Sequence, residues 1–152
     1  MNYTLFYMWQ AHRSSLMAEH SFYVEQAKKR LLSQFIDIES EADRATAAYL
    51  ESAAHLFDPD RHDPSDFYET ARDEGVAFYR LLSDMGERTR LSVIAGMYQE
   101  WDKQLRDWLT KEIRHWHLGN SLLNAVWKAS FENIMDLLVA LGWPVGRSRY
   151  AE

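Results

Sequence analysis

The sequence contains no cysteine, only three prolines and only six glycines in 152 residues. Without cysteine, the chain has no disulfides, thiolate zinc sites, iron–sulfur ligands or cysteine nucleophile. So few glycines and prolines argue against an all-β protein with many turns. The formal net charge of −6 argues against a generic binder of polyanions, which is usually basic. Hydrophobic residues (47%) and aromatic residues (14%) are plentiful, which is enough for the core of one ordinary domain.

Apolar residues recur at helical spacing from residue 16 onward. The first stripe advances in steps of three, four or seven residues, and Ser14 or Ser15 provides a cap for its start. No glycine or proline interrupts residues 1–58, so we expect one very long helix, or one that is broken near residues 39–43. The stripe consists of Leu16, Tyr23, Ala27, Leu31, Phe35, Ile38, Ala42, Ala45, Tyr49, Ala53 and Leu56.

A loop is predicted at residues 58–66, which carry two prolines and four aspartates. Pro64 predicts the start of the next helix, over about 67–85, and Gly86 is expected to end it. Its predicted inward side chains are Phe67, Ala71, Phe78 and Leu82. A third stripe has heptad spacing, typical of helical bundles, and consists of Leu91, Ile94, Tyr98, Trp101, Leu105 and Trp108.

Gly119 and Asn120 are expected to end this third helix, and Asn120 or Ser121 to cap a last one. Gly142 is the expected end of the last helix, whose predicted inward residues are Leu123, Trp127, Phe131, Ile134, Leu138 and Leu141. Four main helices with short connections predict an all-α antiparallel bundle. We expect residues 1–145 to form a single domain and residues 146–152 to form a polar C-terminal tail.

The N-terminal segment 2–9 is apolar and aromatic but far shorter than the roughly 20 residues of a membrane span. It also lacks the positive region and the cleavage site of an export signal. We therefore expect a soluble cytoplasmic protein that does not bind membranes, with segment 2–9 covering part of the core. Docking of a partner is the alternative role for this segment.

Residues 101–117 mix tryptophans with basic residues. This mixture predicts either a protein-docking surface or RNA binding, in which Arg and Lys contact phosphates and Trp stacks on bases. A solvated helix face is the simplest alternative. The expected interaction surface consists of Trp101, Trp108, Trp116, Lys103, Arg106, Lys111 and Arg114.

Two short spacings are of the kind seen in metal sites. Glu112 and His115 form a Glu-x-x-His pair, which is half of a carboxylate-bridged two-iron site. The second half is missing, although Glu51 and His55 lie four residues apart on the first stripe. A mononuclear site built from His20, His55 and His115 is an alternative. Because a full ligand set is not apparent, we expect no metal and no cofactor.

Two segments carry a resemblance, Arg114-His115-Trp116-His117 and Leu141-Gly142-Trp143-Pro144-Val145. With them, the region 101–145 resembles bacterial helical proteins of the HEPN type. The resemblance implies a small antiparallel bundle, dimerisation, and a role in toxin–antitoxin or anti-phage systems. It also implies that active members are metal-independent ribonucleases. In these, an Arg and a His with four to six residues between them in the sequence meet across a dimer.

In this sequence, one pair has that spacing, Arg13 and His20, and it lies at the start of the chain rather than in a late helix. Arg114 and His117 are only three residues apart. No other catalytic set is apparent, while six Trp, eight Tyr and seven Phe exceed what a small core needs.

We therefore expect a non-enzymatic interaction or regulatory protein. It would be a homo-oligomer such as a homodimer, or bind another protein, in a bacterial or phage defence or toxin–antitoxin setting. A HEPN-like ribonuclease is the first alternative, with Arg13, His20, Arg114 and His117 as candidate catalytic residues. A metal-binding bundle is the second alternative.

Overall fold

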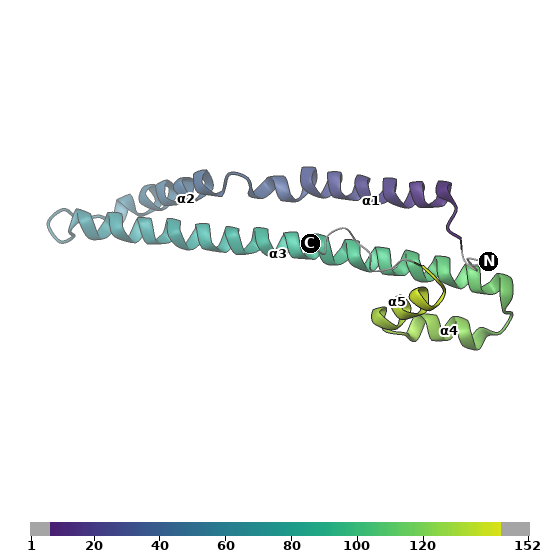
Figure 1. The fold of residues 1–152 in the computed structure, drawn as a ribbon. Coiled ribbons are helices and arrows are strands. Elements are labelled where there is room, and N and C mark those ends of the chain that lie inside the picture. Colours follow the sequence, from purple (N-terminus) through teal and green to yellow (C-terminus); the bar gives the residue numbers. More distant parts are fainter. Residues whose placement is uncertain (1–6, 144–152) are drawn as a thin grey trace, which may run out of the picture. The chain divides into compact units, whose positions relative to one another are not determined.

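The computed structural model describes residues 7–143, and each regular element in that range is a helix (Figure 1). The all-α prediction is therefore confirmed for the described residues. The elements are α1 (Gln10–Arg30), the 3-10 helix η1 (Leu32–Phe35), α2 (Ile38–Ala53), the 3-10 helix η2 (Ala54–Leu56), α3 (Pro64–Trp116), α4 (Asn120–Lys128) and α5 (Phe131–Ala140).

The chain forms two compact units. Unit 1 comprises the described parts of Met1–His20 and Gly96–Glu152, and unit 2 comprises Ser21–Ala95. The single domain over 1–145 stays a prediction, and the tail 146–152 lies outside the described residues.

The first apolar stripe does not form one uninterrupted α-helix. The chain leaves the α-helix after Arg30 and resumes it at Ile38, slightly before the expected break at 39–43. The charges explain the position, because Lys28, Lys29 and Arg30 lie in the last turn of α1 and Glu39 and Glu41 in the first turn of α2. Basic groups stabilise the negative end of the helix dipole and acidic groups the positive end.

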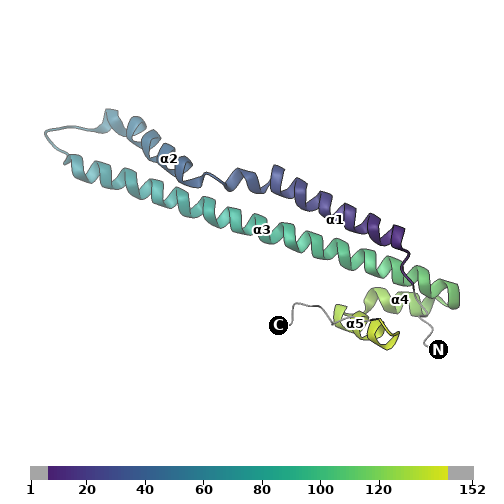
Figure 2. The same cartoon turned by 45° about the horizontal axis from the view of Figure 1, so that its top comes forward.

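In unit 2, α2 runs antiparallel to the first part of α3, and both views show the two helices side by side (Figures 1 and 2). Ala42 and Ala71 are buried, and a Cβ atom at Gly75 would lie 3.3 Å from the Ala42 carbonyl oxygen. At the far end of α2, the rings of Tyr49 and Phe67 lie 6.3 Å apart. Small residues thus let the two backbones approach closely.

Gly86 does not end a helix, so that prediction is wrong. Helix α3 continues through Gly86 to Trp116. A Cβ atom at Gly86 would lie 3.1 Å from Cγ of Phe35 in η1. The glycine therefore makes room for an aromatic ring, and the helix absorbs its low helical propensity.

The start of α3 lies close to where the sequence predicts it. Pro64 is the first helical residue, a position at which its missing N–H costs no hydrogen bond. Asp63 Oδ1 accepts hydrogen bonds from the backbone N–H of Ser65 (2.8 Å) and from Ser65 Oγ (2.7 Å). The bonds from the Ser65 hydroxyl and backbone stabilise the carboxylate and lower the pKa of Asp63.

The heptad stripe of α3 is only partly buried. Leu91, Ile94, Tyr98 and Trp101 are 59%, 56%, 49% and 39% exposed, whereas Trp108 is only 4% exposed. Heptad spacing is therefore not a sign of burial for the first four members of the stripe.

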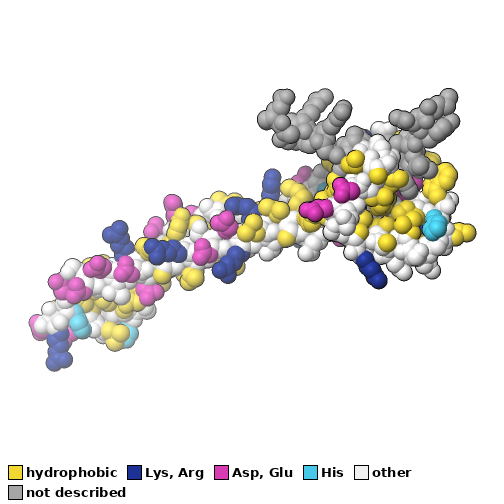
Figure 3. Space-filling view, turned by 60° about the horizontal axis from the view of Figure 1, so that its bottom comes forward, with side chains coloured by type: hydrophobic (Ala, Val, Ile, Leu, Met, Phe, Trp, Pro, Cys, Tyr) yellow, Lys and Arg dark blue, Asp and Glu magenta, His cyan; other side chains and the backbone are white. Residues whose placement is uncertain are grey.

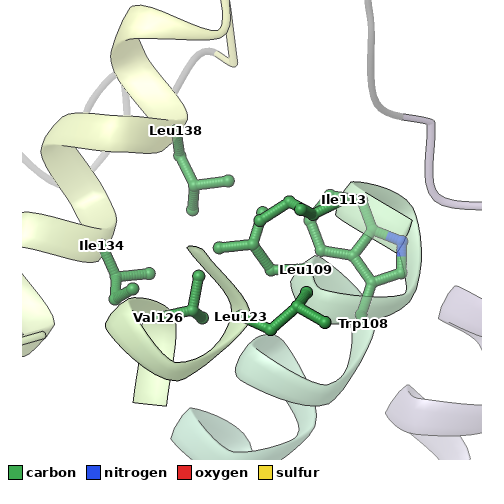
Figure 4. Close-up of a cluster of buried hydrophobic side chains, with 7 residues drawn as sticks. All are labelled: Trp108, Leu109, Ile113, Leu123, Val126, Ile134 and Leu138. Carbon is green, nitrogen blue, oxygen red and sulfur yellow. The ribbon is translucent and has the colours of Figure 1, made fainter. Parts of the chain in front are cut away.

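Unit 1 is built around the last turns of α3. Trp108, Leu109 and Ile113 point toward α4 and α5, where they meet Leu123, Val126, Ile134 and Leu138 (Figure 4). Met8 packs against this cluster from the N-terminal side. This contact agrees with the expectation that the N-terminal segment covers core, although its residues 2–6 lie outside the described range.

The last apolar stripe forms two helices instead of one. Helix α4 ends at Lys128, and α5 begins at Phe131 behind Ser130, whose Oγ accepts a hydrogen bond from the Asn133 N–H (3.2 Å). Because of this turn, Trp127 is 47% exposed instead of facing inward. Gly119 precedes α4 without a side-chain cap, so neither Asn120 nor Ser121 has the predicted role.

Gly142 ends α5 as predicted. Its φ of +84° is the left-handed conformation that glycine adopts most easily. Gly142 N–H donates to the Val139 carbonyl and Trp143 N–H to the Leu138 carbonyl, both at 2.9 Å. These two bonds form a Schellman motif, which satisfies carbonyl groups at the helix end.

In the part of the chain that the structure describes, no helix combines the length and the apolar character needed to cross a bilayer.

The close approach at Gly75 gives a stability prediction. In Gly75→Ala, the new methyl group meets Thr46 Oγ1 and the Ala42 carbonyl, and Thr46 is held in place by its own 3.1 Å bond to that carbonyl. Overpacking of about 1–3 kcal/mol should exceed a helix-propensity gain of up to about 1 kcal/mol. We therefore expect a lower free energy of unfolding in urea titrations.

Ser83→Ala, at an exposed position of the same helix, is the control and should leave stability unchanged or slightly raised. A Gly75→Ala variant as stable as the wild type would contradict the close packing of α2 on α3.

Candidate functional site

Arg106 is the buried charged side chain of unit 1, with 7% of its surface exposed. Its Nη1 donates to the carbonyl oxygens of Val126 (2.6 Å) and Ala129 (2.9 Å), and its Nε donates to Asp102 Oδ2 (2.8 Å). The two carbonyls lie at the C-terminal end of α4, where backbone acceptors have no intrahelical partner. Arg106 therefore ties α3 to the turn between α4 and α5.

Arg106 and Trp108 were expected on an interaction surface, and the structure places both side chains in the interior. Arg106 is held by the end of α4, and Trp108 packs in the core cluster, where its ring centroid lies 4.8 Å from that of Trp143. Asp102 Oδ2 accepts the bond from Arg106 Nε and so positions this side chain, while Asp102 Oδ1 is buried without a hydrogen-bond partner in the described residues. Neither Arg106 nor Trp108 is available to a partner.

The remaining members of the expected surface are exposed. Trp116 is 67% exposed, and Lys103, Lys111 and Arg114 are also on the surface. Trp101 is 39% exposed and belongs to an aromatic cluster with Tyr98 and Phe131.

In this aromatic cluster, ring centroids lie 6.3 Å apart for Tyr98 and Trp101, 5.6 Å for Tyr98 and Phe131, and 5.4 Å for Trp101 and Phe131. The contact joins α3 to the first residue of α5, which sequence periodicity alone does not bring together. The Ser130 cap before Phe131 is the signal that could have indicated it. Exposed ring faces of this kind bind apolar side chains and also stack on bases.

His20 is held between two helices of unit 1. Gln104 Nε2 donates to Glu19 Oε2 (3.3 Å), which turns Gln104 Oε1 toward His20 Nε2 at 3.0 Å. Since an amide oxygen only accepts, His20 Nε2 carries the proton. In the neutral imidazole, Nδ1 is then the free acceptor, as a general base requires. Gln104 and Glu19 are the positioning residues that the sequence reasoning missed.

The other candidate catalytic residues are less constrained. Arg13 is exposed on the same helix as His20, and its seven-residue spacing places it on the same face about 10 Å away along the axis. Arg114 and His117 are both exposed, and His117 lies beyond the end of α3 at Trp116. The structure therefore does not hold Arg114 and His117 together on one helix.

The candidate metal ligands do not form a metal site. Within residues 7–143, no group of three or more His, Asp and Glu side chains is placed to hold a metal ion. Glu112 is half-buried and His115 exposed at the end of α3. Glu51 lies in α2 and His55 in η2, so the α-helical spacing assumed for this pair is interrupted.

The buried arginine gives the second prediction. In Arg106→Met, the carbonyls of Val126 and Ala129 lose their donor and Asp102 becomes an unpaired, partly buried carboxylate. We expect the free energy of unfolding to fall by roughly 2–4 kcal/mol, measured by urea denaturation.

The matched control is Lys103→Met, because Lys103 Nζ lies 3.9 Å from Glu100 and both side chains are more than half exposed. Exposed pairs of this kind contribute less than about 1 kcal/mol. Equal losses in the two variants would contradict the role assigned to Arg106.

Unit 1 thus carries two features with functional potential, the aromatic cluster and the His20–Gln104–Glu19 network. Comparison of the chain with family models, with curated proteins and with solved structures found no match. A proposal for the function is therefore argued from the geometry of the chain itself.

Proposed function

We propose that this chain is a helical interaction protein that associates with copies of itself and folds as an antiparallel bundle. The observation that carries the proposal is the distribution of apolar side chains. In the described residues, 23 large hydrophobic side chains are exposed, whereas 11 hydrophobic residues are buried. A stable monomer would be expected to bury most of these side chains, because burial is the main favourable term in folding.

Some of these side chains are exposed over most of their surface. Leu118 is 96% exposed, Trp9 73% and Trp116 67%. Hydrophobic side chains also gather over the part of unit 1 seen in Figure 3. Single exposed hydrophobic residues are ordinary, whereas large contiguous patches are typical of interaction surfaces. Association would remove such surface from water, at a gain of roughly 25 cal/mol per Å².

The candidate surface of unit 1 is the exposed part of the 101–117 stretch together with Tyr98. Its aromatic members, Tyr98, Trp101 and Trp116, lie on one side of α3, and aromatic side chains are enriched at the centres of interfaces. The resemblance to HEPN-type proteins supports a homo-oligomer in a bacterial defence or toxin–antitoxin setting. These assignments are part of the proposal.

The experiment is sedimentation equilibrium over a roughly hundredfold range of protein concentration, in which mass action reveals association. We expect a dimer or a higher oligomer, in reversible exchange with monomer at low concentration. A single monomeric species across the whole range would contradict self-association.

A metal-independent ribonuclease is a second candidate, supported by the geometry of His20. This histidine is half-buried, held by Gln104 and left with a free Nδ1. The test is cleavage of structured RNA in EDTA, with activity expected to be lost in His20→Ala. His12→Ala, at an exposed position on the same helix, is the control and should remain active. Absence of cleavage by the wild type would contradict this candidate.

A further inference from the structure

One face of α3 in unit 2 has a sequence that reads nearly the same in both directions. With 100° of rotation per residue, six residues between 77 and 95 lie in a band about 80° wide. This band, called here the outer face, consists of Ala77, Leu81, Asp84, Arg88, Leu91 and Ala95. It lies on the side of the helix opposite to Gly75, Gly86 and Val93, which face the interior of unit 2.

The outer face is symmetric about the level of residue 86. Ala77 and Ala95 are equally far from this level, and so are Leu81 and Leu91. Asp84 and Arg88 form the innermost pair and have opposite charges. The order is therefore small, apolar, acidic, basic, apolar, small along about 27 Å of helix.

All six residues of the outer face are exposed. Leu81 is 69% exposed and Leu91 59%. Asp84 and Arg88 are four residues apart on one helix, yet no ion pair or hydrogen bond joins the side chain of either one to another described residue. On the face of unit 2 seen in Figure 3, hydrophobic side chains alternate with charged ones of both signs. Two leucines and two complementary charges thus remain unpartnered.

We propose that the outer face of α3 pairs with the outer face of a second copy, antiparallel, about a two-fold axis at the level of residue 86. This inference rests on the proposed self-association and assigns to it an interface in unit 2, in addition to the candidate surface of unit 1. In this arrangement Leu81 meets Leu91 of the second copy, and Asp84 meets Arg88 of the second copy. The two-fold axis produces each contact twice, as in every isologous interface.

Charge complementarity indicates both that the binding partner is a second copy and that the two helices pair antiparallel. A parallel pairing in register would place Asp84 beside Asp84 and Arg88 beside Arg88 of the second copy, and like charges in contact repel. Binding of a different protein would not require the outer face to be symmetric, whereas pairing with an identical copy does. The alanines at both ends leave room for the helices to approach, and the leucines supply the apolar contact.

The test uses charge reversal followed by sedimentation equilibrium. Asp84→Arg alone and Arg88→Asp alone should each weaken the dimer by at least about tenfold, because each puts like charges together at both symmetric positions. The double variant, Asp84→Arg with Arg88→Asp, should regain dimerisation. An equimolar mixture of the two single variants should form a heterodimer, because the first variant is positive at both positions and the second is negative at both.

The control is Arg90→Glu, a charge reversal at an exposed position of α3 that lies outside both the outer face and the candidate surface of unit 1. This variant should associate as the wild type does. Circular dichroism of each variant checks that helix content is retained, which is expected because the changed side chains are exposed. Restoration in the mixture is a readout that a folding defect does not produce.

Cysteine variants test the direction, since the chain has no cysteine of its own. Leu81→Cys and Leu91→Cys should form an intermolecular disulfide when mixed and oxidised, and neither should cross-link to itself. In an antiparallel pair, two copies of residue 81 would lie about 15 Å apart along the axis, too far for a disulfide. Self-cross-linking of either variant would overturn the antiparallel arrangement.

The outcomes separate this inference from the proposed function. A wild-type protein that is monomeric throughout overturns both. A wild-type dimer that is unchanged by Asp84→Arg and by Arg88→Asp overturns the outer-face interface and leaves self-association standing.

Discussion

The fold of unit 1 depends on one requirement, that the carbonyl groups at the end of α4 receive hydrogen bonds. Helices of nine and ten residues, such as α4 and α5, are not stable alone in water. They form because their apolar sides pack on Leu109 and Ile113 of α3, and because Arg106 supplies donors to the turn between them. This turn also places Phe131 against Trp101, so the exposed aromatic cluster depends on the same arginine.

In unit 2 the contacts of Gly75 and Gly86 and the exposed leucines of the outer face lie on different sides of α3. Phe35 reaches Gly86, and Ala42 and Thr46 reach Gly75, all on the inner side. The outer face contributes nothing to these contacts. Selection for folding therefore does not explain why Leu81 and Leu91 are apolar, since exposed polar residues would serve the helix equally well. The proposed self-association would give these two leucines a role.

The sequence predicted those features that depend on local chemistry. Pro64 at a helix start and Gly142 at a helix end act through their own backbone properties, and they lie as expected. The predictions that proved wrong depend on contacts between residues that are distant in the sequence. Gly86 looked like a break because the ring of Phe35, distant in the sequence, was not visible in the pattern.

The same distinction applies to the candidate site. Arg106 is indistinguishable from Lys103 in a list of basic residues, and only the position of the α4 end shows that one is buried and the other exposed. His20 was noticed for its spacing from Arg13, whereas the Gln104 bond that fixes its tautomer joins residues 84 positions apart. The break was expected near 39–43, and the basic and acidic clusters on the two sides of residues 31–37 are the signal that could have placed it before Ile38.

The two candidate functions share one physical condition. Arg13 and His20 lie on one face of α1 about two helical turns apart, roughly 10 Å along the axis. The resemblance to HEPN-type proteins implies that an Arg and a His of this kind meet across a dimer. The proposed interaction protein also associates with copies of itself. Self-association is therefore the condition that the two candidate functions share as they are proposed.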